Sequence, residues 1–151
     1  MLGFPTQSHS WDHVMDKNAK SVFFLTQIFA NYLLNSDHDA QLPYTIRIIS
    51  SVSAFASSIN KAVYRSSKAA VGMVAKTFAQ RLAPEGIQVF DIQPGIIEID
   101  LSRPVLETYN TMIKNHGITL EPKLGQPDEV GKAVASKAND ELHNCVGQTV
   151  D

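Results

Sequence analysis

Apolar residues recur at three- and four-residue intervals through the first third of the chain, the pattern of one face of a helix. The members of this stripe are Trp11, Val14, Met15, Val22, Leu25, Phe29 and Tyr32. Ser10 stands directly before the stripe and is the predicted N-cap. The most apolar window, residues 21–34, predicts a buried helix and not a membrane span, because Thr26, Gln27 and Asn31 interrupt it.

Two short apolar runs flank a longer segment rich in alanine and lysine. Residues 45–50, TIRIIS, are too few for a helix and predict a strand buried on both faces of a parallel sheet. Residues 61–83 predict a helix that stops at Pro84-Glu85-Gly86. Its small side chains permit close packing, either on the sheet of the same domain or on a helix of another chain. Residues 87–92, IQVFDI, predict a second strand parallel to the first.

The last third of the chain predicts two further helices. Residues 104–115 carry apolar residues on one side, which predicts a short helix. A last helix begins near Pro127, because proline suits the first helical position and the acids Asp128 and Glu129 favour the first turn. No internal repeat, low-complexity segment or linker appears, so we expect one domain.

Composition narrows the class of protein. The 151 residues are 44% hydrophobic and 19% charged, as in a globular protein with a real core. The formal charge of −2 comes from interspersed signs and offers no basic stripe, so we expect no nucleic-acid partner. The single cysteine, Cys145, has no partner for an internal disulfide and no neighbouring metal ligands. We expect a cytoplasmic protein with no metal and no membrane association.

Candidate chemistry gathers around the first predicted strand and the helix that follows it. Tyr64 and Lys68 are one helical turn apart, so their side chains share a face. An ammonium beside a phenol favours the phenolate, which makes the two residues a candidate acid/base pair. The same spacing also occurs where an aromatic ring leans on a lysine stem at a surface. Ser51, at the end of the strand and thirteen residues before Tyr64, favours the chemical interpretation.

Ser51, Tyr64 and Lys68, with Pro94-Gly95 after the next strand, resemble the catalytic half of a short-chain dehydrogenase/reductase. The stretches IRIISSVSAF, AVYRSSKAAV and RLAPEGIQV are most similar to the bacterial 3-oxoacyl-carrier-protein reductase type. The resemblance implies an α/β fold: the second half of a Rossmann-like, doubly wound parallel sheet with helices on both faces. It also implies a closing strand at residues 146–151.

The same resemblance implies a role for each candidate residue. Tyr64 would give or take the hydroxyl proton, Lys68 would assist it and bind the ribose of NAD or NADP, and Ser51 would orient the substrate oxygen. Asn18 corresponds to a helix asparagine that holds a water in a proton relay. From the residues alone, an asparagine bonded to nearby backbone is the simpler interpretation of Asn18.

The loop after the second strand corresponds to the part of the family that meets the nicotinamide. Pro94, Gly95 and Ile97 match the positions whose backbone makes that contact. Ile99 stands where the family usually has threonine, and isoleucine supplies no hydroxyl. Residues 104–115 correspond to the variable substrate lid.

A glycine-rich phosphate-binding turn is absent from this sequence, whose eight scattered glycines never form G-x-x-x-G-x-G. We therefore expect residues 1–151 to be a single truncated dehydrogenase domain that lacks the N-terminal nucleotide-binding half. Its activity would be hydride transfer between NAD or NADP and a small carbonyl or alcohol. As an isolated fragment it would bind the cofactor poorly and be inactive.

The alternative is a non-catalytic protein, either a remnant or an oligomerisation partner of a full-length relative. The strand at residues 45–50 would have an unpaired edge, which is an aggregation hazard unless another chain covers it. We therefore expect a homo-oligomer or association with a full-length relative.

Overall fold

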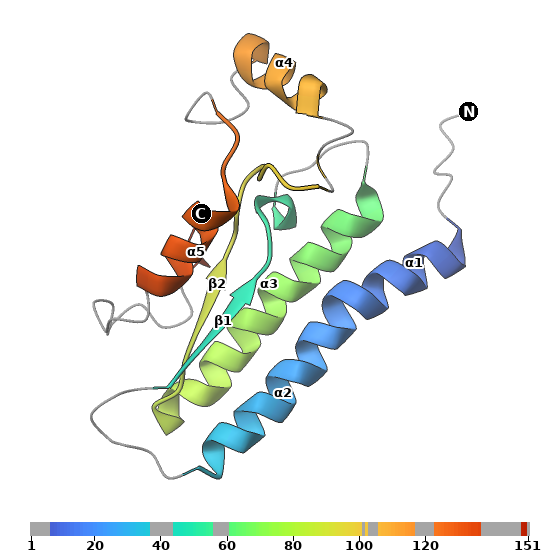
Figure 1. The fold of residues 1–151 in the computed structure, drawn as a ribbon. Helices are drawn as coiled ribbons and strands as arrows, with labels where there is room; N and C mark the ends of the chain where they lie inside the picture. Colours follow the sequence, from blue (N-terminus) through green and yellow to red (C-terminus); the bar gives the residue numbers. More distant parts are fainter. Residues whose placement is uncertain are drawn as a thin grey trace.

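The computed structural model describes residues 7–36, 44–55, 61–100, 102, 106–116, 123–136 and 149–150. In these ranges a parallel sheet has the strand order β1-β2-β3, with β1 Thr45–Ile49, β2 Gln88–Ile92 and β3 Thr149–Val150. The α-helices are α1 Ser8–Met15, α2 Ser21–Leu34, α3 Ala62–Leu82, α4 Leu106–His116 and α5 Pro127–Ser136. Figure 1 shows α1, α2 and α3 on one side of the sheet and α5 on the other. This confirms the predicted α/β fold, whereas Cys145 and residues 146–148 lie outside the described ranges.

The two longer strands are buried to different extents. Val89 and Asp91 of β2 are 0% and 2% exposed, because β1 and β3 flank this strand and α3 packs on it. In β1, Ile46 and Ile48 belong to the core, whereas Ile49 is 47% exposed. The prediction that β1 is buried on both faces is therefore wrong, because alternate side chains of a strand point to opposite faces and α3 covers one of them.

α3 packs closely on the sheet through small residues. Ala75 and Ala79 are buried in the core, and a Cβ added to Gly72 would lie 3.2 Å from an oxygen of Asp91. The domain's own sheet therefore accounts for this part of the small-residue surface. The chain leaves the helix at the predicted stop, where Gly86 has a φ of 72° in the left-handed region that glycine favours.

The first helix begins earlier than the sequence pattern predicts. Its N-cap is Gln7, whose backbone is extended, and the amide of Trp11 bonds to the Gln7 carbonyl at 3.1 Å. Ser10 therefore lies inside α1, and the prediction that it caps the helix is wrong. Between α1 and α2 the backbone forms a π-helical turn over Asp16–Lys20, which the pattern did not predict. A π-turn changes the number of residues per turn and so rotates the residues that follow about the helix axis.

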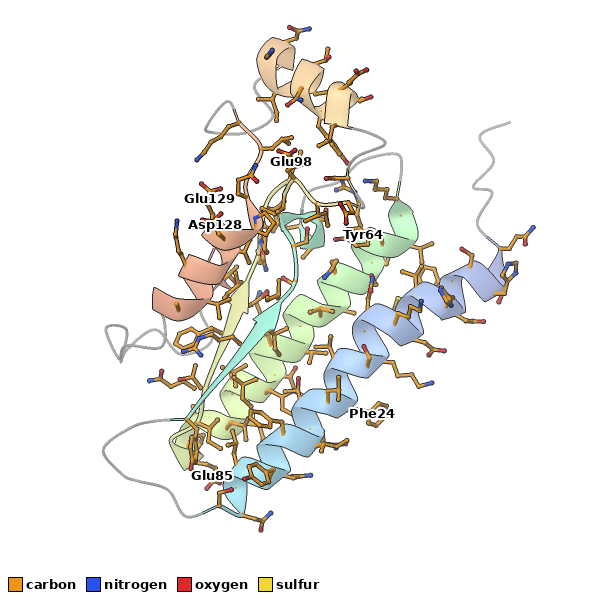
Figure 2. All side chains as sticks on the ribbon, viewed as in Figure 1. Phe24, Tyr64, Glu85, Glu98, Asp128 and Glu129 are labelled. Carbon is orange, nitrogen blue, oxygen red and sulfur yellow. The ribbon has the colours of Figure 1, made fainter. Side chains whose placement is uncertain are left out.

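The buried side of α2 consists of Thr26, Ala30 and Leu33. Its largest apolar residues are exposed and form what we name the α2 outer face: Phe24 50%, Leu25 66%, Ile28 65%, Phe29 48% and Tyr32 67%. Figure 2 shows Phe24 pointing away from the sheet. The prediction of a buried helix over residues 21–34 is therefore wrong for this chain, because only one side of α2 faces α3 and the core, and the α2 outer face lies on the opposite side.

The two C-terminal helices lie near their predicted positions. α5 begins with Pro127 as its first residue and has Asp128 and Glu129 in its first turn, as predicted. α4 spans Leu106–His116, and the predicted start at residues 104–105 lies outside the described ranges. Within the described part of the chain, no helix combines the length and the hydropathy that a bilayer span requires.

Candidate active site

The predicted serine lies where β1 ends. Ser51 is 7% exposed, and its Oγ accepts a hydrogen bond of 3.1 Å from the amide of Ser53. This bond caps a 3₁₀ turn over Val52–Ala54, which packs against α3. The amide of Val52 donates to the carbonyl of Pro94 at 3.2 Å. The chain after β1 is thus tied to the loop after β2, and Ser51 is held at the carboxyl edge of the sheet.

Tyr64 and Lys68 lie on the first turns of α3, at the same end of the sheet. The Lys68 Nζ is 5.9 Å from the centroid of the Tyr64 ring and donates a 3.3 Å hydrogen bond to the carbonyl of Ile49. Ile49 precedes Ser51 by two residues, so the lysine reaches the strand end that carries the serine. Figure 2 places Tyr64 at the N-terminal part of α3, where its side chain is 37% exposed.

The electrostatics of Lys68 come from two opposed effects. The side chain is half-buried between α3 and β1, and this desolvation lowers the pKa of Lys68. The negative charge of Asp91 in β2 raises the pKa of Lys68 and so partly offsets the effect of burial.

Asn18 lies in the middle of the π-helical turn and faces α3. Its Nδ2 donates a 3.0 Å hydrogen bond to the Oγ of Ser67, which in turn donates to the Tyr64 carbonyl at 2.7 Å. Ser67 is fully buried. A chain of two hydrogen bonds therefore joins the predicted relay asparagine to the backbone of the predicted acid/base tyrosine.

The loop after β2 runs beside the segment that leads into α5. The amide of Gly125 bonds to the Ile96 carbonyl and the amide of Glu98 bonds to the Gly125 carbonyl, each at 2.9 Å. This is a parallel bridge between Ile97 and Gly125. In this bridge Gly125 bonds to Ile96 and Glu98, the residues on either side of Ile97. The N–H and C=O of Ile97 therefore point away from Gly125. On the side away from Gly125, the backbone of Ile97 is therefore oriented to contact a bound group.

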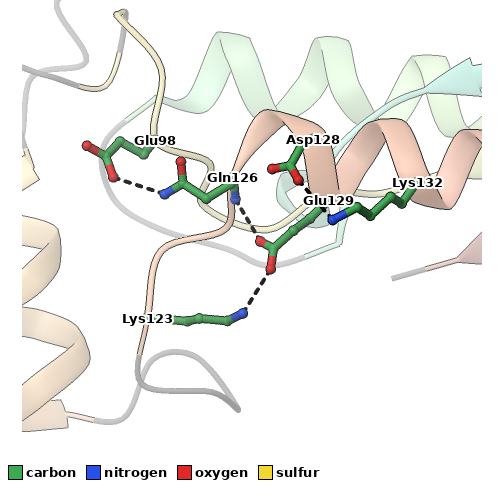
Figure 3. Close-up of polar contacts among 6 residues, drawn as sticks. All are labelled: Glu98, Lys123, Gln126, Asp128, Glu129 and Lys132. Atoms are coloured by element: carbon green, nitrogen blue, oxygen red, sulfur yellow. Dashed lines mark hydrogen bonds and ion pairs between the residues drawn. The ribbon is translucent and has the colours of Figure 1, made fainter.

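Side chains reinforce the same connection, as Figure 3 shows. Gln126 donates from Nε2 to Glu98 at 3.0 Å, and its backbone amide donates to Glu129 at 2.7 Å. Lys123 pairs with Glu129 at 2.9 Å, and this hydrogen bond is the largest of the effects that lower the pKa of Glu129. Ile99, the position without the usual hydroxyl, is 45% exposed. These bonds fix the start of α5 to the loop that carries Ile97.

α4 is joined to the residue before α3 by a side-chain contact. Lys61, which precedes α3 and has a φ of 70°, donates to the hydroxyl of Tyr109 at 2.8 Å. A cleft of about 420 Å³ lies beside α4 and has Leu106, Asn110 and Glu98 among its lining residues. The predicted lid region is thus attached to the helix that carries Tyr64 and Lys68.

Two polar residues next to the site were missed by the sequence analysis. Ser67 lies on the same segment as Tyr64 and Lys68, and its signal was a second small polar residue within YRSSK. Asp91 is a charged residue inside the apolar run IQVFDI, which was signal enough to question a purely structural strand. Both are buried in the structure.

The residues present fit one end of a dinucleotide. Tyr64, Lys68 and the outward-directed backbone of Ile97 lie at the carboxyl edge of a parallel sheet, where this fold binds ligands. No glycine-rich turn in the 151 residues supplies the amides that hold a pyrophosphate. The fit therefore extends to a nicotinamide and its ribose and not to the phosphates.

A parallel α/β sheet with serine, tyrosine and lysine at its carboxyl edge places this chain in the class of proteins with a Rossmann-like fold. A family model described as enoyl-(acyl carrier protein) reductase matches residues 4–151. Together with the named relatives, this shows that the chain belongs to the short-chain dehydrogenase/reductase family, and that it is similar to the 3-oxoacyl-carrier-protein reductase type.

Sequence relatives agree with this assignment. The chain is 32% identical to 2-dehydro-3-deoxy-D-gluconate 5-dehydrogenase of Bacillus subtilis, over 91% of this chain and 52% of the relative. It is 29% identical to 3-oxoacyl-[acyl-carrier-protein] reductase of Thermotoga maritima, over 95% of this chain and 56% of the relative. The chain therefore spans about half the length of the curated relatives that it matches.

Solved structures give the same result. The 3-oxoacyl-[acyl-carrier protein] reductase of Brucella melitensis in complex with NAD has a TM-score of 0.91 at 30% identity, over 97% of this chain and 57% of that one. A putative 2-deoxy-D-gluconate 3-dehydrogenase of Agrobacterium tumefaciens with bound NADP has a TM-score of 0.81 at 25% identity, over 97% and 58%. Both nicotinamide cofactors thus occur among the structural neighbours.

Proposed function

We propose that this chain supplies the catalytic half of an oxidoreductase that transfers hydride between NAD or NADP and a carbonyl or alcohol. The observation that carries the proposal is the position of Lys68, which contacts both the Tyr64 ring and the strand end that bears Ser51. The relatives are named for substrates as different as sugar acids, acyl thioesters and cyclopentanol, so the proposed substrate is a carbonyl or alcohol without further definition.

In this proposal Tyr64 and Ser51 act on the substrate oxygen, and Lys68 acts through Tyr64. Tyr64, which is partly exposed at the edge of the sheet, would exchange the proton. Lys68 would stabilise the phenolate form of Tyr64 as a nearby cation. Ser51 accepts a bond from the amide of Ser53, and in that arrangement its hydroxyl keeps a hydrogen to donate to the substrate oxygen.

Asn18 would hold the water of a proton relay. Its position in a π-helical turn supports this role, because such turns are frequent at functional sites. The bond from Asn18 to Ser67, which in turn donates to the Tyr64 carbonyl, ties the π-helical turn to α3 at this point.

When bound, the nicotinamide would supply or accept the hydride. Tyr64 and Lys68 would hold its ribose, and the backbone of Pro94, Gly95 and Ile97 would contact the nicotinamide itself. The 151-residue chain offers no phosphate-binding turn, so we propose that it is a single truncated domain and is inactive by itself.

The second candidate function is non-catalytic association with a full-length relative or with a second copy. The α2 outer face favours it, because the five large apolar residues that form this face are exposed on one side of the helix.

A fusion protein tests the proposed function. The N-terminal part of the Thermotoga maritima reductase that lies outside the match would be joined to residues 7–151 of this chain. We expect the fusion to bind NADPH or NADH and to reduce at least one of a panel of ketones and 3-oxoacyl thioesters. Tyr64→Phe should lower kcat/KM by about 100-fold or more, whereas Tyr32→Phe, on the α2 outer face, should leave it unchanged. A fusion that binds the cofactor yet reduces nothing would favour the non-catalytic alternative.

The chain by itself provides the complementary measurement. Titrating the purified chain with NADPH while recording nicotinamide fluorescence should give no saturable signal in the micromolar range. Saturable micromolar binding would overturn the proposal that the chain is inactive for want of a phosphate site.

A further inference from the structure

Asp91 is a carboxylate in the most deeply buried strand of the sheet. It lies in β2 opposite Ile48 of β1 and Thr149 of β3, and it is 2% exposed. Val89, two residues earlier and on the same face, is a fully buried member of the core. A carboxylate in such surroundings is strongly unfavourable unless hydrogen bonds compensate for the lost water.

Two short hydrogen bonds supply that compensation, one to each oxygen. Ser50 Oγ donates to Oδ1 and Gln93 Nε2 donates to Oδ2, both at 2.6 Å. The two donors are themselves buried, at 3% and 5% exposure. Because both partners donate, Asp91 accepts at both oxygens, which is the pattern of a charged carboxylate.

These bonds join the two strand ends that carry the candidate site. Ser50 follows β1 and immediately precedes Ser51, and Gln93 follows β2 and immediately precedes Pro94. Asp91 therefore connects the residue beside the candidate substrate-orienting serine to the residue beside the candidate nicotinamide loop.

The helix above Asp91 is shaped to admit the carboxylate. A Cβ added to Gly72 of α3 would lie 3.2 Å from Oδ2 of Asp91 and 3.8 Å from Nε2 of Gln93, so the glycine leaves room for both groups. Lys68 is one turn before Gly72, on the same side of the helix. The carboxylate thus lies beneath the part of α3 that presents Lys68, and its charge opposes the effect of burial on the pKa of that lysine.

We propose that Asp91 is a positioning residue for this site: it holds the ends of β1 and β2 through Ser50 and Gln93, and it places a negative charge beneath the turn of α3 that presents the half-buried Lys68. This proposal rests on the proposed function for its catalytic meaning. Its test does not, because both measurements below are made on the chain without cofactor or substrate.

The first measurement is the titration of Lys68 by NMR, with its side-chain signal assigned through Lys68→Arg. Asp91→Asn keeps the shape of the side chain and removes its charge. In the unaltered chain the Gln93 Oε1 is buried without a partner among the described residues. In the variant, rotation of the Gln93 amide allows this oxygen to accept a hydrogen bond from the new asparagine. The midpoint of Lys68 should move to lower pH, because burial is then no longer opposed. Asp128→Asn removes an exposed carboxylate on α5 and should leave the midpoint where it is.

The second measurement is amide hydrogen exchange in the turn after β1. The Val52 N–H donates to the Pro94 carbonyl, and the Ser53 N–H donates to Ser51 Oγ. Ser50→Ala breaks the link to Asp91 and should raise exchange at these two amides by about tenfold. Ser66→Ala, at an exposed position of α3, should leave them unchanged. An unmoved Lys68 midpoint in Asp91→Asn, or unchanged exchange in Ser50→Ala, would overturn the assignment. A fusion without reductase activity would instead count against the proposed function alone.

Discussion

The inward side of α3 and the outward side of α2 are both apolar, yet residues of this chain cover only the side of α3. α3 buries Ala75 and Ala79 against the sheet, where small side chains let the helix approach closely. α2 leaves Leu25 and Ile28 about two-thirds exposed. The difference shows that an apolar helix face indicates the need for a packing partner but does not identify that partner. For α3 the partner is within the chain, and for α2 we expect it to be another protein surface.

The largest expected effect comes from the same substitution made on each face. Leu82→Ala, at a position that is 2% exposed, should lower the free energy of unfolding by about 2–5 kcal/mol. Leu25→Ala, at 66% exposure, should change it by less than about 0.5 kcal/mol. Urea unfolding at submicromolar concentration measures both. Equal costs would show that the α2 outer face is already covered in the species that unfolds.

The second-largest effect is expected from a charge placed on the α2 outer face, which should weaken self-association. We expect the chain to associate at micromolar concentration, and Ile28→Lys to raise the dissociation constant about tenfold or more, because an ammonium would have to be desolvated in the contact. Sedimentation velocity measures the association. Gln27→Lys adds the same charge at an exposed polar position of the helix and is the matched control. A compact monomer throughout the micromolar range would contradict this expectation.

The same contrast explains what could be predicted from the sequence. Strand–helix–strand order and the stop at Gly86 follow from local pattern, and the structure confirms them. The π-turn does not follow from the spacing of apolar residues; in the structure it packs against α3. The error over residues 21–34 has a related cause, since periodicity identified an apolar stripe but could not tell a face covered by the chain itself from one that another surface must cover.

At the site, spacing located Tyr64 and Lys68 on one face of α3 and Ser51 at a strand end, as the structure has them. The supporting contacts of Ser67 and Asp91 were beyond that reasoning. They join residues of different elements, such as Asn18 with Ser67, and sequence separation gives no indication of such a bond.

A moderate effect is expected where α1–α2 meets α3 through a polar contact. Asn18→Ala removes the hydrogen bond to Ser67 and should lower the free energy of unfolding by about 0.5–1.5 kcal/mol. Asn31→Ala, at an exposed position of α2, is the control for the higher helix propensity of alanine, and it should be neutral or slightly stabilising. Chemical denaturation of the two variants side by side gives the difference. Equal stability of the two would mean that the bond to Ser67 contributes nothing.

The smallest effect is a difference in the pH dependence of stability. It compares the contributions of Lys68, half-buried on α3, and Lys132, exposed on α5. Burial lowers the pKa of Lys68, so over the interval between its folded and unfolded pKa the unfolded chain binds more protons, and its contribution to stability rises with pH. The hydrogen bond to Asp128 raises the pKa of Lys132, so its contribution is present at neutral pH and is lost as pH rises through the folded pKa.

Subtracting the unfolding free energies of Lys68→Met and Lys132→Met from that of the unaltered chain, between about pH 7 and about pH 11, isolates the two lysines. The two difference curves should slope in opposite directions. The Lys132 curve should also flatten in high salt, since that pair is exposed, whereas the Lys68 curve should persist, because desolvation and not a surface charge is its main cause. Curves of the same sign would mean that the charge of Asp91 outweighs the desolvation of Lys68 in the folded chain, and a flat Lys68 curve would mean that the two effects cancel.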